Sequence, residues 1–234
     1  MGSTPGQPDL GYGVHTVMLT PAYYVGMMEV MQGQLQAVMG YNPSVDQDCD
    51  GFGPVNCPVE NGSRWQSAAY ANAVSDAAGL QDCYTCTGSG RDVQCDGVPN
   101  PYDCAGDRLL TEAEWEGAAR CGTDTAYAGS NTSNDVAWTS ENRDGTQAVA
   151  GLAPNVCGLY DMSGNVWEWT QDGYGGYPSG GVTDPIGAES FSDRVIRGGV
   201  WDDVADVATV SWRSFYDRDG SYYRLGFRLA RSSP

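Results

Sequence analysis

Basic residues are scarce in this chain of 234 residues. It has 12 lysines and arginines and one histidine against 30 aspartates and glutamates, which gives a formal net charge of −18. Such a charge repels nucleic acid and anionic membrane surfaces, so we expect neither as a partner. It favours cations as partners, calcium above all. The alternative is that the charge only keeps a secreted protein soluble.

Long apolar runs and enzyme motifs are also missing. No stretch of about 18 apolar residues is present, so we expect no membrane insertion. The sequence shows no signal peptide, no glycine-rich phosphate loop and no internal repeat. The single histidine, His15, falls in a predicted strand and is interpreted as structural. We expect a secreted or cell-surface protein of bacterial type, extracellular or periplasmic, whose signal segment is not in this chain.

The cysteines favour disulfides over a zinc site. Zinc binding by Cys83 and Cys86 would need a second ligand pair at similar spacing, but Cys95 and Cys104 lie nine residues apart and His15 is distant. Disulfides indicate an oxidising compartment. The compartment and the net charge therefore both agree with a secreted protein.

The eight cysteines are even in number, but their connectivity cannot be deduced from the sequence. We expect Cys49 to pair with Cys57, and we expect some pairing among the four cysteines of the segment 83–104. Cys121 and Cys157 either pair with each other or remain buried thiols. The segment 83–104 is rich in glycine, serine, aspartate and proline, which predicts a disulfide-stapled insertion.

Composition and periodicity predict one loop-rich domain over residues 1–234. Hydrophobic residues make up 41% of the chain, and 32 glycines and 12 prolines indicate much irregular structure. β-formers predict a strand within 14–25, and near-helical spacing predicts helices over 29–39 and from about Trp65 to Ala78. From Asn155 onward, short aromatic and β-branched runs predict small strands with long connections.

The clearest helix signal is a capping box at Thr111. Its hydroxyl would cap the helix, while Glu114, three residues later, would reach back to the backbone. The predicted helix runs to about Arg120 and ends near Gly122. After Gly122 we expect no further helix.

Several ordered motifs carry a family resemblance over almost the whole chain. They include 24–30, 39–44, 57–60, 108–115, the block from Gly158 to Asp172, Arg197-Gly-Gly-Val-Trp201 and Leu225-Gly-Phe-Arg228. The chain resembles the formylglycine-generating enzyme, or sulfatase-modifying factor, family. The resemblance implies an α+β fold that is a variant of the C-type lectin fold, with few short helices and small antiparallel sheets.

The family's founding enzyme oxidises a substrate cysteine with copper held by two cysteines. By the resemblance those thiols would lie between Gly198 and Phe227, where this chain has none. We therefore expect no copper and no catalytic residues. The alternative is a copper oxidase acting on protein cysteine that uses Cys121 and Cys157. A third hypothesis is a structural subunit of an extracellular assembly, which would self-associate.

Two acidic loops are candidate calcium sites. In the family a calcium ion is wrapped by the loop matching 161–168, which implies as ligands the Asp161 carboxylate, the Gly164 and Val166 carbonyls and the Glu168 carboxylate. Calcium prefers six to eight such oxygen ligands. A second loop has a D-x-D-x-D-G pattern but lacks the closing acid, because the nearest glutamate is Glu60. Its candidate ligands are Asp46, Asp48 and Asp50.

The segment from Arg197 to Arg228 is the candidate binding surface. Seven of its 32 residues are aromatic, against 11% in the whole chain, and arginines and aspartates alternate with them. Aromatic area combined with directional hydrogen bonds is typical of binding surfaces. Trp201 and Phe227 belong to family motifs and are expected in the core. The candidate ligand-binding residues are Asp202, Asp203, Asp206, Trp212, Phe215, Tyr216, Asp217, Asp219, Tyr222 and Tyr223.

The same segment resembles variable proteins of diversity-generating retroelements. These share the lectin-type frame, with Arg-Gly-Gly-x-Trp and Gly-Phe-Arg at this separation and substituted positions between them. Many candidate positions carry residues that are reachable by mutating adenines of an asparagine codon, although Trp212 is not. The function predicted from the sequence is non-catalytic binding of a protein or glycan on a calcium-braced, lectin-like scaffold.

Overall fold

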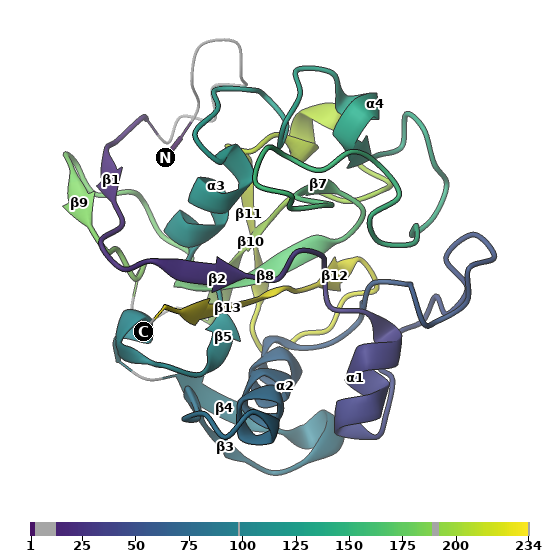
Figure 1. Ribbon diagram of the computed structural model, residues 1–234, viewed down its shortest axis with the longest axis vertical. Helices are drawn as coiled ribbons and strands as arrows, with labels where there is room; N and C mark the ends of the chain where they lie inside the picture. Colours follow the sequence, from purple (N-terminus) through teal and green to yellow (C-terminus); the bar gives the residue numbers. More distant parts are fainter. Residues whose placement is uncertain (3–12, 98, 189–191, 234) are drawn as a thin grey trace.

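The computed structural model describes residues 1–2, 13–97, 99–188 and 192–233 (Figure 1). Its helices are α1 (Gln32–Met39), α2 (Arg64–Ala77), α3 (Glu112–Arg120) and α4 (Ser133–Val136), with 3₁₀ turns η1 (Gly90–Asp92), η2 (Pro101–Asp103) and η3 (Ala205–Ala208). Its strands are β1 (Val17–Met18), β2 (Tyr23–Val25), β3 (Tyr84–Thr87), β4 (Gln94–Gly97), β5 (Asp107–Leu109), β6 (Ala137–Trp138), β7 (Ser163–Gly164), β8 (Trp167–Gly173), β9 (Val182–Thr183), β10 (Asp193–Arg197), β11 (Arg213–Asp217), β12 (Leu225–Gly226) and β13 (Leu229–Ser232). The predicted loop-rich α+β class is confirmed.

A four-stranded sheet in the order β11-β10-β8-β12 organises the C-terminal half. β10 pairs antiparallel with β11 and with β8, whereas β12 runs parallel to β8. A three-stranded sheet, β2-β13-β5, joins the two ends of the chain, so β13 lies beside β2 in Figure 1. The candidate binding segment thus begins in the central strand β10 and continues into the edge strand β11.

The main core lies between the four-stranded sheet and α2. Trp169, Ile196, Leu225 and Phe227 are buried in one cluster, and the ring of Tyr70 on α2 meets Phe227 edge-on at 5.6 Å between centroids. Trp201 and Phe227, which lie in the family motifs at the two ends of the candidate binding segment, were both expected in the core. Phe227 is buried there, while Trp201 is only partly buried against it.

The helices follow their capping signals closely. Thr111 accepts a hydrogen bond from the Glu114 backbone N–H at 3.2 Å, and the Glu114 carboxylate accepts one from the Thr111 N–H at 2.8 Å. The capping box is therefore confirmed. A second one at Ser63 starts α2 one residue earlier than predicted. The helix predicted over 29–39 begins at Gln32, because Met31 is still extended.

Other details differ from the sequence-based expectations. The strand expected within 14–25 is two short strands, β1 and β2, which leaves His15 outside any strand. Not every strand pair is antiparallel, since β1–β9 and β6–β7 are parallel. The four-residue helix α4 follows Gly122, after which no helix was expected. It is too short to show the apolar periodicity that identifies a helix in sequence.

All eight cysteines lie in described residues and form disulfides. Cys49 pairs with Cys57 as expected, and Cys121 pairs with Cys157. In the insertion, β3 and β4 form a hairpin rather than a loop. One disulfide joins Cys86 to Cys95 across this hairpin, and another joins Cys83 to Cys104. Within the described ranges, no helix is long and apolar enough to cross a membrane.

Candidate functional site

Strand β11 divides the candidate binding residues between two faces. Successive side chains of a strand point to opposite sides. Tyr216 packs on the core side, with its ring 6.2 Å from that of Trp169 on β8. Phe215 points to the other side, where its ring lies 4.5 Å from that of Tyr174. Phe215 and Tyr216 therefore cannot belong to one continuous contact surface, although the sequence segment contains both.

The residues that come together form what we call the aromatic surface: Asp202, Tyr216, Tyr222, Tyr223, Arg224 and Trp201. Tyr216 and Tyr222 stack at 5.4 Å between ring centroids, and Tyr223 meets Tyr222 edge-on at 5.0 Å. The Arg224 guanidinium lies 4.6 Å from the Tyr223 centroid and 5.6 Å from that of Trp201. It also pairs with Asp202. Sequence reasoning missed Arg224 and placed Trp201 in the core.

This surface holds unsatisfied polar atoms. The Trp201 indole Nε1, Asp202 Oδ1 and Arg224 Nε are buried and have no hydrogen-bond partner among the described residues. Buried polar groups are almost always paired, and leaving one unpaired costs about 1–3 kcal/mol. Tyr223 is 41% exposed beside them. The surface therefore combines accessible aromatic area with polar groups that lack partners.

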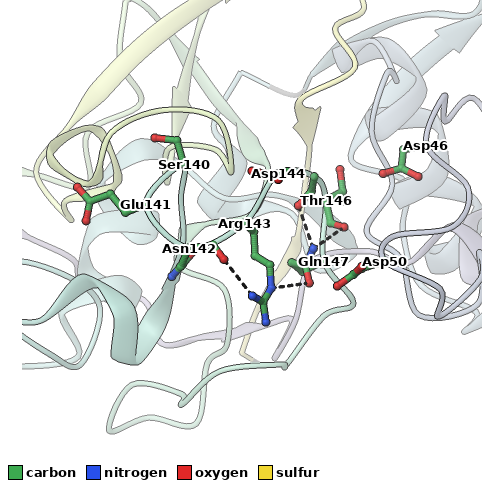
Figure 2. Close-up of a pocket in the computed structure, with 10 residues that line it drawn as sticks. Asp46, Asp50, Ser140, Glu141, Asn142, Arg143, Asp144, Thr146 and Gln147 are labelled. Carbon is green, nitrogen blue, oxygen red and sulfur yellow. Dashed lines mark hydrogen bonds between the residues drawn. The ribbon is translucent and has the colours of Figure 1, made fainter.

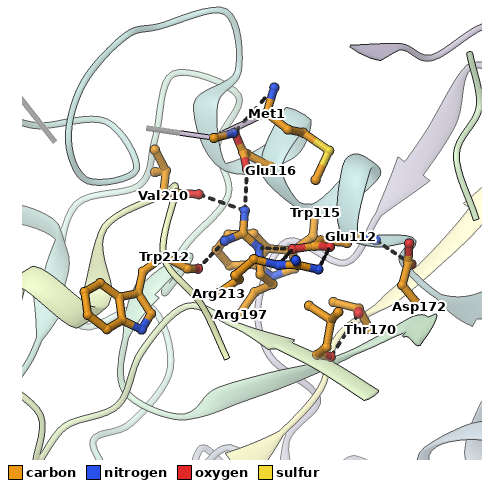
Figure 3. A network of polar contacts seen from close by, with 12 residues as sticks. Met1, Glu112, Trp115, Glu116, Thr170, Asp172, Arg197, Val210, Trp212 and Arg213 are labelled. Carbon is orange, nitrogen blue, oxygen red and sulfur yellow. Dashed lines mark hydrogen bonds and ion pairs between the residues drawn. The ribbon is translucent and has the colours of Figure 1, made fainter. Parts of the chain in front are cut away.

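Two buried arginines hold the backbone of residues 210–213 (Figure 3). Arg197 donates to the Glu116 carboxylate at 2.5 Å, to the Val210 carbonyl at 3.0 Å and to the Trp212 carbonyl. Arg213 binds both oxygens of Glu112, at 2.8 and 2.7 Å. These contacts fix the chain from 210 to 213 from the inside. Residues on its outer side can therefore change without loss of the frame.

The remaining candidates lie outside the aromatic surface. Asp203 is held by its backbone and is partly buried, since its carbonyl accepts hydrogen bonds from the Ser140 N–H and hydroxyl, both at 3.0 Å. Asp219 accepts from the Trp65 indole at 2.6 Å. Asp217 caps the backbone N–H of Asp219, Asp206 is exposed on η3, and Trp212 is partly buried against the core.

Burial beside Asp202 raises the pKa of the Asp203 carboxyl. Burial is the larger cause, and the negative charge of Asp202 adds to it. This neighbour is already paired with Arg224. Asp203 is therefore a poor anchor for an external cation, and its main role is to hold the adjoining loop.

In the predicted calcium loop, Glu168 has other partners. Its carboxylate oxygens accept from Arg228 Nε at 2.9 and 2.8 Å, from Arg228 Nη2 at 2.6 Å and from the Trp115 indole at 2.7 Å. Both side chains of the pair are 0% exposed. A carboxylate has about four lone-pair sites. Three N–H donors, one of them shared between both oxygens, therefore occupy most of the lone pairs of Glu168.

Asp161 fits a cation better. It is buried and accepts one hydrogen bond, from the Ala150 N–H at 2.7 Å. Burial raises its pKa to about 6. Glu29, which sequence reasoning missed, accepts from the Asn165 side chain at 2.7 Å, and burial together with the charge of Asp161 raises its pKa well above the usual range. No group of three acidic, histidine or cysteine side chains suited to a metal ion occurs within the described ranges.

The backbone conformation of the predicted calcium loop requires a glycine at position 164. Gly164 has φ 76°, a conformation that L side chains rarely adopt, and a Cβ there would lie 2.1 Å from the Trp138 carbonyl oxygen. Val166 donates its backbone N–H to Glu29 at 3.3 Å. The close backbone packing thus explains the glycine without a metal.

The side chain of Asp46 stabilises the turn of the second acidic loop. Asp46 Oδ1 accepts from the backbone N–H groups of Asp48 and Cys49, at 3.1 and 3.3 Å. Glu60, the nearest glutamate, accepts from the Asp46 N–H at 2.8 Å, and burial raises its pKa to about 7. Asp46 and Asp50 line a cavity of about 460 Å³ opposite residues 140–147 (Figure 2), whereas Asp48 is not part of its wall. Calcium binding at this loop stays a prediction.

Comparison with known proteins gives the family. Residues 2–233 match the model of the sulfatase-modifying factor enzyme 1-like domain. The chain is 30% identical over 239 residues to the chaperone protein LppX of Paenibacillus barcinonensis, covering 90% of this chain and 80% of that protein. It is 35% identical over 150 residues to the formylglycine-generating enzyme of Streptomyces coelicolor, covering 55% of this chain but only 48% of the enzyme.

Among solved structures, Treponema denticola variable protein 1 superposes with a TM-score of 0.86 at 33% identity, covering 100% of this chain and 94% of that one. That protein is a variable protein of a diversity-generating retroelement. Fold and sequence agree on the α+β, C-type-lectin-like architecture expected from the motifs. The chain belongs to the sulfatase-modifying factor enzyme 1-like domain family.

Proposed function

We propose that this protein binds a protein or glycan ligand without catalysis, outside the cell, through the aromatic surface. The observation that carries the proposal is the group of three buried, unpartnered polar atoms on Trp201, Asp202 and Arg224 beside exposed Tyr223. A ligand that pairs with these atoms would remove their desolvation cost. Aromatic residues and arginine are also the residue types enriched at binding hot spots.

Contacts within the aromatic surface support the same function. Because Tyr222 stacks on Tyr216 and Arg224 lies over the Tyr223 ring, the aromatic side chains are pre-organised. Pre-organisation lowers the entropy that is lost on binding. The similarity to a protein named a chaperone is compatible with a protein ligand, and a lectin-like fold is compatible with a glycan.

The test is a binding screen followed by matched variants. The purified protein is screened on a glycan array and against surface proteins of the host bacterium, and each interaction found is measured with Tyr223→Ala and Phe215→Ala. The two residues are exposed to similar extents, 41% and 47%, but lie on different surfaces. We expect Tyr223→Ala to weaken binding at least tenfold and Phe215→Ala to leave it unchanged. Equal effects of both variants would refute the assignment of the surface.

A diversified origin of this surface is a further part of the proposal. The similarity to a variable protein supports it, as does the separation of exposed Tyr223 from the buried frame residues Phe227 and Arg228. The test is genomic: a reverse transcriptase gene and a near-duplicate template that differs at adenines should lie nearby. Their absence would leave ordinary evolution as the source of this surface.

For calcium we propose a site on Asp161 with the Gly164 and Val166 carbonyls. Among the described residues, Arg228 is the arginine whose charge lowers the pKa of both Glu29 and Asp161, and it already holds Glu168, so a cation would stabilise the ionised forms of these two carboxyls. Millimolar calcium should raise the melting temperature relative to EGTA, and Asp161→Asn should abolish the difference. Identical melting with calcium and with EGTA would end this proposal.

The copper-oxidase alternative requires two free thiols. Both of its candidate cysteines, Cys121 and Cys157, are joined in a disulfide, and the chain has no free cysteine. Self-association as a structural subunit stays a prediction, and light scattering across a concentration series tests it.

A further inference from the structure

Three arginines converge on one cavity, although the chain has only 12 basic residues besides its histidine. Arg64 begins α2, Arg194 lies on β10 and Arg218 follows β11. All three line a cavity of about 400 Å³, together with Trp65, Pro99 and Pro101. The cavity borders the insertion hairpin and shares no lining residue with the aromatic surface.

Gln171 brings two of these guanidinium groups together. Arg64 Nη2 donates to the Gln171 carbonyl at 3.4 Å and to its side-chain oxygen at 2.9 Å. Arg194 Nη1 donates to the same carbonyl at 3.2 Å. Arg64 is only 2% exposed, and the Nε atoms of Arg64, Arg194 and Arg218 are buried with no hydrogen-bond partner among the described residues. Donor groups are therefore left over at this cavity.

The negative charges nearby do not compensate these arginines. Within the described ranges, neither Arg64 nor Arg194 forms an ion pair, and Arg218 lies 3.9 Å from Asp219, which already accepts from the Trp65 indole. Asp96 lies exposed on the cavity wall, and burial raises the pKa of buried Asp172 to about 8. The charge of Asp172 favours the charged forms of Arg64 and Arg194, and that of Asp96 the charged form of Arg194, but neither carboxylate forms an ion pair with them among the described residues.

Electrostatics inside the cavity point the same way. Burial lowers the pKa of Arg64 to about 10, and the positive charges of Arg194 and Arg218 contribute to the same decrease. Burial and Arg218 likewise lower the pKa of Arg194. Arg218 thus destabilises the charged forms of Arg64 and Arg194, and Arg194 destabilises that of Arg64. An anion between them would reverse this effect.

We propose that this cavity binds a small ligand through an oxyanion group, a carboxylate, sulfate or phosphate, held by Arg64, Arg194 and Arg218. Planar guanidinium groups bind such oxyanions through paired, charge-assisted hydrogen bonds. The Trp65 ring and Ile186 on the same wall would contact the apolar body of the ligand. A cavity of about 400 Å³ lies in the usual size range of small-molecule sites. This site is independent of the aromatic surface and of its ligand.

The experiment uses the Trp65 indole N–H as a local reporter. Sulfate, phosphate and acetate are titrated separately into ¹⁵N-labelled protein against chloride at constant ionic strength. We expect at least one oxyanion to shift this resonance with saturation at millimolar concentration or below. Which of the three binds most tightly then identifies the group.

Variants locate the site. Arg194→Gln should weaken this binding at least tenfold, whereas Arg231→Gln, on β13 and outside the cavity, should leave it unchanged. If Arg194→Gln fails to fold, Arg218→Gln replaces it, because that side chain is 36% exposed, and binding should weaken at least threefold. No saturable shift with any oxyanion, or equal affinity in the cavity variant, would overturn the proposal. Neither result bears on the Tyr223 test.

Discussion

Replacing Glu168 by glutamine is the sharpest test of the buried frame. The substitution keeps the shape but removes the charge that faces Arg228 through three hydrogen bonds of 2.6 to 2.9 Å. Arg228 is 0% exposed, so water cannot take over. Removing one partner of a buried ion pair typically costs about 3–5 kcal/mol. Since domains of this kind are stable by about 5–15 kcal/mol, we expect a loss of that size to be easily measured.

The assay is urea unfolding followed by tryptophan fluorescence, in buffer with EGTA and in buffer with calcium. Because the expected loss comes from the unpaired arginine, it should be the same in both buffers. Glu141→Gln, at an exposed position, is the matched control and should change the free energy of unfolding by less than about 0.5 kcal/mol.

Two results would refute this reasoning. A loss of less than about 1 kcal/mol in both buffers would mean that the pair is not needed for stability. A loss that occurs only with calcium would mean that Glu168 is a metal ligand, as the family resemblance implied. In that case Arg228 would have to find other partners, such as the Tyr160 carbonyl to which it already donates at 2.8 Å.

Three further predictions concern stability. Burial raises the pKa of Asp172 to about 8, whereas its pKa in the unfolded chain is about 3.9. The free energy of unfolding should therefore fall as the pH rises from about 4 toward 8, by at most about 1.4 kcal/mol per pH unit. Asp172→Asn should flatten this slope in pH-dependent unfolding, and an unchanged slope would mean that another group causes it. Replacing Cys121 and Cys157 together by serine should cost about 2–4 kcal/mol in urea unfolding, and a neutral result would mean that the disulfide is dispensable. Gly164→Ala should cost more than about 1 kcal/mol, because its Cβ would meet the Trp138 carbonyl at 2.1 Å, whereas Gly176→Ala, with open space around it, should be near neutral.

Local signals in the sequence were reliable where both partners lie close in the chain. Thr111 and Glu114 form the capping box three residues apart, and Cys49 pairs with Cys57. The disulfide connectivity within 83–104 could not be predicted, because it depends on the hairpin that sets Cys86 opposite Cys95. The family motifs supplied the overall fold class, which local signals alone do not determine.

The composition of the candidate binding segment did not predict which face of the sheet each side chain occupies. Its aromatic content predicted one surface, but strand alternation at β11 sends Phe215 toward Tyr174 and Tyr216 toward Trp169. The signal was present, because the run from Arg213 to Asp217 could have been read as a strand of period two. Glu29 gave no such signal. Its contact with Asn165 spans 136 residues and depends on the tertiary fold.

Whether a buried arginine pairs with a carboxylate distinguishes the structural arginines of this chain from those of the proposed anion site. Arg197, Arg213 and Arg228 each meet a buried glutamate, and each holds a stretch of backbone. Arg64 is as deeply buried, but in the described ranges it donates hydrogen bonds to Gln171, lies over the Trp65 ring and pairs with no carboxylate. A buried charge without a counter-charge costs several kcal/mol. In a protein with an excess of 18 negative charges, a carboxylate would be the simplest solution at this position. Its absence is therefore better explained by an anion from outside the chain than by stability.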